Sequence, residues 1–215
     1  MEHRDSGIIL RLQPLTETSL IVRWITRDEG RISTVAKGAR RSKSPFQGKL
    51  DLYYEADFTY VRSRQSTLHN LRELGLRATN SLLRRELVWL HQSAYAARII
   101  EQNTEEETPI VDLFSLFTGF VRSLPLHSPS PLAVLSFEFQ AMALLGWSPE
   151  LSQFNLQEGD RGLFVELASK PWIEIQTEIA SPQSTRNIAK GMSRFMSYHL
   201  HRIPEGRNGA LGFNP

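Results

Sequence analysis

The first 77 residues alternate apolar and polar positions over short runs, with turn-forming residues between the runs. Five runs have the β-branched and aromatic composition typical of strands: GIILRLQ at 7–13, TSLIVRWIT at 18–26, RISTVAK at 31–37, LYYEADFTYVR at 52–62 and STLHNLRELGL at 66–76. Five short strands in a segment of this length predict a small barrel. A five-stranded OB-type barrel is the first interpretation. An SH3-like barrel is the second, because strand count alone barely separates the two.

From residue 80 onward, apolar residues recur at spacings of three and four, which is the period of a helix. Helices are predicted over 81–101, 108–124, 130–146 and roughly 184–202. The second is expected to begin at Thr108 and Pro109. The third is expected to begin at Ser130 and to end at Gly146, since Ser and Gly are typical capping residues.

The chain is therefore predicted to be an α+β protein with a barrel domain at 1–79 and a mainly helical domain at 80–215. Within 148–180, the run GLFVELASKPWIEI resembles two short strands with a turn near Pro171. We expect a small β-hairpin there. The last residues, 205–215, are expected to be disordered.

Charge is distributed unevenly along the chain. The net charge is only +2, but residues 1–79 hold 14 Lys and Arg against 9 Asp and Glu, a net of +5, and the remainder is at −3. Attraction for nucleic acid is therefore expected in the first third. A charge of this size also fits a role in solubility alone.

The chain has no cysteine, which excludes disulfides, thiolate zinc sites and cysteine nucleophiles. The N-terminus lacks the apolar core of a signal peptide, and no stretch approaches the roughly 18 apolar residues of a membrane span. The sequence thus predicts a cytoplasmic protein with no membrane segment.

One stretch, VAKGARRSKSPFQGKL at 35–50, has five basic residues and no acidic one. Cations among glycine and serine can follow a phosphate backbone without demanding one base sequence. Candidate DNA-binding residues are Lys37, Arg40, Arg41 and Lys43, which lie on a connection between strands. The alternative is a surface loop whose charges serve solubility, and the pattern alone does not decide between them.

A second basic segment, YVRSRQS at 60–66, adds Arg62 and Arg64 as candidate DNA contacts that could extend the basic stripe. Four aromatic residues alternate nearby: Tyr53, Tyr54, Phe58 and Tyr60. Aromatic residues on a barrel face can stack on bases. The core of the barrel is the favoured place for them.

The sequence offers no catalytic or metal-binding motif. The consecutive residues Glu105, Glu106 and Glu107 cannot all face one metal ion and are interpreted as a solvated linker. Neither a Gly-rich phosphate loop nor a GxSxG motif occurs. We therefore predict no enzyme activity, no cofactor and no metal.

Residues 17–44 resemble the N-terminal segment of the RecO family of bacterial DNA repair proteins. Three features carry the resemblance in order: ETSL at 17–20, the turn residues Thr26, Glu29, Gly30 and Arg31, and VAKGAR at 35–40. Weaker similarity follows at LRELGL (71–76), FEFQAMALLGW (137–147) and RFMSYHLHR (194–202). The resemblance as a whole spans most of the chain but is strong only in the first 50 residues.

The resemblance implies an N-terminal OB fold, a helical C-terminal domain and no enzyme chemistry. It implies binding of single- and double-stranded DNA, annealing of complementary strands and loading of recombinase onto DNA coated with single-stranded DNA-binding protein. The implied partners are RecR, in some bacteria RecF, and the tail of the single-stranded DNA-binding protein. The family's basic DNA-binding loop falls on Lys37, Arg40, Arg41 and Lys43.

The chain departs from the family in three places. Some members carry a four-cysteine zinc module, and residues 148–180 here hold no cysteine, only the remnant of such a module. Members often have arginines just before the Phe-Glu pair that stands here at 137–138, but this chain has Leu135 and Ser136 there. This difference weakens the expectation that the chain binds the acidic tail of the single-stranded DNA-binding protein. The C-terminal tail is not basic. An interaction scaffold with weak or lost DNA binding is therefore the alternative function.

Overall fold

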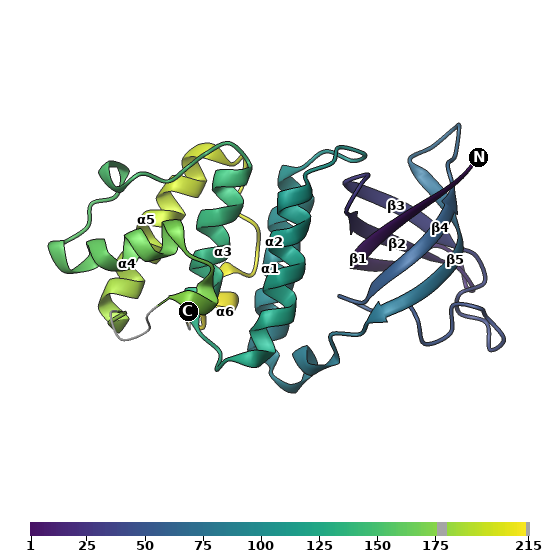
Figure 1. The fold of residues 1–215 in the computed structure, drawn as a ribbon, viewed down its shortest axis with the longest axis horizontal. Coiled ribbons are helices and arrows are strands. Elements are labelled where there is room, and N and C mark those ends of the chain that lie inside the picture. The colour runs from purple at the N-terminus through teal and green to yellow at the C-terminus, as the bar shows by residue number, and fades with distance from the viewer. Residues whose placement is uncertain (176–179, 214–215) are drawn as a thin grey trace. The chain divides into compact units, whose positions relative to one another are not determined.

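Five strands close the N-terminal segment into a barrel in the computed structural model, which describes residues 1–175 and 180–213 (Figure 1). The strands are β1 Glu2–Pro14, β2 Leu20–Thr26, β3 Arg31–Ala36, β4 Glu55–Val61 and β5 Leu68–Ala78. Their order around the barrel is β1-β2-β3-β5-β4, and β1 closes it by pairing with both β2 and β4. Only β3 and β5 run parallel. The predicted five-stranded OB-type barrel is confirmed.

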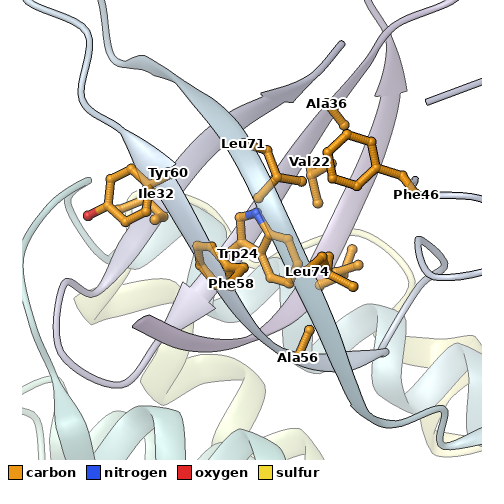
Figure 2. Packing of buried hydrophobic residues seen from close by; sticks show 11 residues of the cluster. Val22, Trp24, Ile32, Ala36, Phe46, Ala56, Phe58, Tyr60, Leu71 and Leu74 are labelled. Atoms are coloured by element: carbon orange, nitrogen blue, oxygen red, sulfur yellow. The ribbon is translucent and has the colours of Figure 1, made fainter. Parts of the chain in front are cut away.

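The interior of the barrel is filled by aromatic and branched side chains (Figure 2). Trp24 stacks on Phe58 with ring centroids 4.3 Å apart, and its indole nitrogen donates a hydrogen bond to Thr34 Oγ1 at 2.9 Å. Tyr53, Phe58 and Tyr60 are almost completely buried. The interpretation of these aromatic residues as core is therefore confirmed, and they are not exposed for stacking on bases.

Strand directions place the four connections at two ends of the barrel. Because β1 is antiparallel to β2 and β4, and β3 is antiparallel to β2, the connections 15–19 and 37–54 leave from the same end. We call this the loop end. The connections 27–30 and 62–67 leave from the other end, which we call the far end.

The described residues after the barrel form helices. The α-helices are α1 Leu87–Asn103, α2 Val111–Ser123, α3 Pro131–Leu144, α4 Glu158–Ser169, α5 Pro182–His199 and α6 Arg207–Leu211; the short 3₁₀ helices are Ser81–Arg85, Leu124–Leu126, Leu151–Gln153 and Trp172–Glu174. Ser130 caps α3 by accepting a hydrogen bond from the Leu132 amide, and Gly146 follows it with φ +94°, as predicted. The predicted cap at Thr108 is wrong, because α2 begins at Val111.

The predicted β-hairpin within 148–180 is wrong in the residues that the structure describes. The run 158–169 is helix α4, in which Leu163, Phe164 and Leu167 are buried while Val165 is 56% exposed. The start of α4 is held by Asp160, which accepts a hydrogen bond from the Gln157 amide at 3.4 Å. A short apolar run fits both periods, so its alternation alone misleads. Residues 176–179 of the predicted hairpin lie outside the described residues.

The expectation of a disordered tail is also wrong for the described residues 205–213. Helix α6 buries Ala210 and Leu211, and its first residue Arg207 makes two bonds to Glu138 of α3, at 2.6 and 2.8 Å. Glu138 is fully buried and also accepts a hydrogen bond from the Tyr95 hydroxyl at 2.6 Å. The Arg207–Glu138 ion pair is therefore one of the contacts that order a segment whose composition suggests a loop.

The chain divides into two compact units. The first contains Met1–Ser81 and Thr104–Thr118, and the second contains Leu82–Asn103 and the described residues from Gly119 onward. The predicted domain border between residues 79 and 80 stays a prediction. None of the described helices is both long enough and apolar enough to cross a membrane.

Candidate nucleic-acid interface

The connection 37–54, which we call the basic loop, presents four exposed cations at the loop end. Lys37, Arg40, Arg41 and Lys43 all lie on the surface, and none of them makes an ion pair with a described residue. A chain of turns orders the backbone between them: the Arg41 amide donates to Gly38 O at 3.0 Å, and the Ser44 amide donates to Arg41 O at 3.1 Å. The charges are thus carried on a defined backbone and remain available to an external anion.

The basic loop is anchored to the barrel at two points. The Arg40 amide donates to Thr18 O at 3.0 Å, and the Gly38 amide donates to Ser19 Oγ at 3.3 Å, so the loop rests on the connection 15–19. Further along, Phe46 inserts into the barrel core and is 5% exposed (Figure 2). Sequence reasoning missed Thr18 and Ser19, because nothing in the pattern shows which polar residues receive a distant loop.

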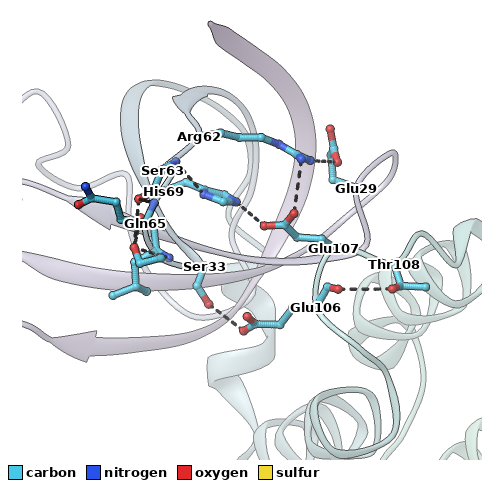
Figure 3. A network of polar contacts seen from close by, with 11 residues as sticks. Glu29, Ser33, Arg62, Ser63, Gln65, His69, Glu106, Glu107 and Thr108 are labelled. Carbon is cyan, nitrogen blue, oxygen red and sulfur yellow. Dashed lines mark hydrogen bonds and ion pairs between the residues drawn. The ribbon is translucent and has the colours of Figure 1, made fainter.

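Arg62 and Arg64 lie at the far end, so they do not extend the basic loop. Arg62 forms ion pairs with Glu29 and Glu107, and its separation from the Glu107 carboxylate is 3.4 Å (Figure 3). Arg64 is exposed. The expectation of one stripe through both basic segments is wrong, because the strand between them, β4, carries the chain from one end of the barrel to the other.

The acidic run at 104–108, which we call the acidic strap, binds the far end of the barrel. Glu107 lies 2.9 Å from His69 Nε2, close enough for an ion pair when the ring is protonated but not aligned as a hydrogen bond. Ser33 donates to Glu106 at 3.4 Å (Figure 3). The Glu107 amide donates to Arg31 O at 2.8 Å. The interpretation of Glu106 and Glu107 as a purely solvated linker is therefore wrong.

Gly30 makes room for the acidic strap. Its φ is +73°, and a Cβ atom built there would lie 2.1 Å from the carbonyl oxygen of Thr108. The turn 27–30 thus needs glycine both for its backbone angle and for the close approach of the strap. Among residues 1–175 and 180–213, no group of three or more His, Asp or Glu side chains is arranged to hold a metal ion.

The sequence matches a known protein family in two segments. Residues 1–79 match the family model described as recombination protein O N terminal, and residues 85–156 match the one described as recombination protein O C terminal. A protein of Rhodopirellula baltica named DNA repair protein RecO is 37% identical over 143 residues, which cover 66% of this chain and 53% of that protein.

Two more relatives carry the same name. The one from Bifidobacterium longum subsp. infantis is 29% identical over 155 residues, covering 69% of this chain and 63% of that protein. The one from Myxococcus xanthus is 27% identical over 158 residues, covering 74% and 64%. The chain thus spans between about half and two thirds of the length of these relatives. With both family models matched in order along one chain, the protein belongs to the RecO family.

Proposed function

We propose that this chain acts in recombinational DNA repair by binding single- and double-stranded DNA and annealing complementary strands. The observation that carries the DNA contact is the ordered basic loop, in which Lys37, Arg40, Arg41 and Lys43 are exposed without carboxylate partners among the described residues. Family membership supports the repair pathway. The loading of recombinase onto DNA coated with single-stranded DNA-binding protein belongs to the same proposal.

The mechanism is electrostatic. Cations on the basic loop neutralise phosphates and release condensed counterions, which gives affinity without reading bases. Two complementary strands repel each other through their phosphates, and a protein that neutralises both lowers that barrier to pairing. Base complementarity then supplies specificity, so no reacting group is needed and we propose no catalytic role.

The proposed DNA contact does not include Arg62, since two carboxylates already hold its guanidinium. Arg64 is exposed at the far end, and its neutralisation tests whether bound DNA extends along the barrel. Loss of affinity in an Arg64→Gln variant would add this residue to the interface.

The partners we propose are RecR and, in some bacteria, RecF, without assigning either to a surface. For the tail of the single-stranded DNA-binding protein, the two positions before Phe137 give no support. Leu135 and Ser136 are buried in α3, so neither presents a side chain to an acidic peptide. A pull-down with each purified partner tests these contacts.

The deciding experiment is a salt titration of DNA binding with Arg40→Gln and Arg41→Gln combined. Each phosphate contact contributes about 0.7 to the slope of log K against log salt for single strands, so two lost contacts lower the slope by roughly 1.4. The matched control is Arg161→Gln with Arg186→Gln, which removes the same charge from exposed helical positions.

Unchanged affinity and slope in the loop variant would contradict the assignment of the basic loop. The alternative function, an interaction scaffold without DNA binding, predicts a different result. It requires that the wild-type chain binds RecR in a pull-down but binds neither single- nor double-stranded DNA at low salt.

A further inference from the structure

A charged groove lies on the outer face of the barrel, where β1, β4 and β5 run side by side. Its volume is about 530 Å³, and three cations line it: Arg4 from β1, Lys49 from the basic loop and Arg72 from β5. The candidate residues of the sequence do not include any of these three. The groove is therefore a second positively charged surface, separate from the tip of the basic loop, which we define as residues 37–43.

Local backbone irregularity builds the groove. The register between β4 and β5 shifts between Thr59 and Tyr60, so that Thr59 pairs with Glu73 while Tyr60 pairs with Leu71. Leu71 and Leu74 both face the core, and the bulge directs Arg72 outward beside Glu73. The three-residue spacing of these leucines breaks the strand period, which is the one signal of the bulge in the sequence.

Two further residues give the groove its depth. Gly75 pairs with Asp57 across the strands and contributes no side chain to the outer face. Pro45 and Phe46 of the basic loop also line the groove. Phe46 is anchored in the core and divides the basic loop into two parts. Lys43 precedes this anchor, and Lys49 follows it. The Lys49 ammonium lies 3.5 Å from Leu74 O.

The balance of charge in the groove is positive. Its lining holds three cations and two carboxylates, but Asp57 accepts a hydrogen bond from Arg77 at 2.7 Å and another from Ser6 at 2.7 Å. Burial opposes ionisation of Asp57, yet these hydrogen bonds and the charges of Arg77 and Arg4 outweigh it and lower the pKa of its carboxyl. With Asp57 neutralised by Arg77, three cations face one remaining carboxylate, that of Glu73.

The chemistry of the lining suits the phosphates of a polynucleotide more than its bases. The aromatic residues of the lining, Phe46 and Phe58, are 5% and 2% exposed, so neither offers a ring face for stacking. Arg4 on β1 and Arg72 on β5 are exposed on the two strands that flank β4, and each can contact a separate phosphate. Contacts of this kind hold a strand without reading its sequence.

We propose that the groove between β1, β4, β5 and the basic loop binds the phosphate backbone of a second nucleic-acid strand while the tip of the basic loop holds the first. This rests on the proposed function. The two surfaces share one loop, with Lys37, Arg40, Arg41 and Lys43 before the Phe46 anchor and Lys49 after it. One small barrel then neutralises both strands that are to be paired.

The test combines stoichiometry with annealing. At low salt, a six-nucleotide oligothymidylate, near the lower limit of about four nucleotides for such barrels, is titrated into the full chain. The wild type is expected to bind two oligonucleotides. Arg4→Gln with Arg72→Gln is expected to bind one, as is Arg40→Gln with Arg41→Gln, and both double variants are expected to anneal complementary strands at least tenfold more slowly.

The control variant Arg161→Gln with Arg186→Gln is expected to bind two oligonucleotides and to anneal at the wild-type rate. The four mutated arginines of the barrel are exposed, and an unchanged thermal midpoint verifies that the variants fold. Two bound oligonucleotides and wild-type annealing in the groove variant would overturn the second-strand site and leave the proposed function standing. The same holds if the wild type binds only one.

Two other results have separate meanings. If the wild type binds no oligonucleotide at low salt, the proposed function fails together with the groove. If the groove variant keeps both oligonucleotides but loses binding of poly-glutamate, the groove is a site for acidic peptide, and the second-strand proposal is overturned.

Discussion

The two ends of the barrel both carry cations, yet they differ in what those cations meet. At the loop end, Arg40 and Arg41 extend into solvent from an ordered loop. At the far end, Arg62 is held by Glu29 and Glu107, and the acidic strap covers neighbouring polar groups. A phosphate that approaches Arg62 must displace a carboxylate, whereas one that approaches Arg40 displaces only water and counterions.

This difference teaches that a basic residue becomes a candidate DNA contact only when the fold leaves its charge uncompensated. Arg62 and Arg40 are alike in the sequence, and their partners distinguish them. Arg207 is the extreme case, since its guanidinium is nearly buried against Glu138.

Replacement of Arg207 by Met is expected to have the largest effect on stability. Glu138 would remain fully buried without its cation, and breaking a buried pair in this way costs about 3–5 kcal/mol. The free energy of unfolding in urea measures the loss. DNA affinity, measured where the variant is still folded, is expected to be unchanged, and partial recovery is expected when Glu138→Gln is added.

A pair of glycine substitutions compares the two ends directly. Gly30→Ala is expected to destabilise the chain by about 1–3 kcal/mol, because alanine would adopt φ +73° and meet the Thr108 carbonyl of the acidic strap. Gly48→Ala in the basic loop has a similar φ of +70° but open space around it, so only the backbone cost remains, about 1 kcal/mol. Equal losses in thermal midpoint or urea unfolding would show that the strap does not pack there.

The barrel was predictable from the sequence, because its strands alternate with a period of two and its turns hold Gly, Pro and charged residues. The helices with clear caps, such as α3 after Ser130, were predictable for the same reason. Helix α4 was not, since Leu163, Val165 and Leu167 satisfy the strand period while the buried set follows the helix period.

The site was predictable only in part. The four exposed cations of the basic loop lie within the seven positions 37–43, so composition revealed them. Contacts between distant residues left no such trace: Glu107 meets His69 across 38 positions, and Arg207 meets Glu138 across 69. Arg4 and Arg72 come together only because β1 and β5 both flank β4.

Replacement of Arg62 by Met is expected to have a smaller effect on stability than either change above. Its ion pairs are about one-third exposed, and such pairs contribute about 0.2–1 kcal/mol. The slope of DNA affinity against salt is expected to stay at the wild-type value, in contrast to Arg40→Met. A slope reduced equally by both variants would mean that compensation by carboxylates does not separate the two ends.

The Asp57–Arg77 pair provides the smallest and most specific test. The folded-state pKa of Asp57 lies below its ordinary value of 3.8, so ionisation of Asp57 favours the folded chain above that pH. Asp57→Asn is therefore expected to lower the free energy of unfolding at pH 7 by less than about 1 kcal/mol. The difference from wild type should shrink as the pH falls through the folded-state pKa, which urea unfolding at pH 7 and below pH 3 can measure.

The same substitution is expected to turn Arg77 from a cation paired with a carboxylate into an unpaired one. Asp57→Asn removes a carboxylate from the groove and releases Arg77, whose side chain is 58% exposed. If uncompensated charge decides which arginines bind phosphate, this variant should bind single-stranded DNA more tightly than the wild type. Its salt slope should be steeper by up to about 0.7, the contribution of one phosphate. Adding Arg77→Gln should remove the gain, and a gain that survives this second change would mean that Arg77 does not supply it.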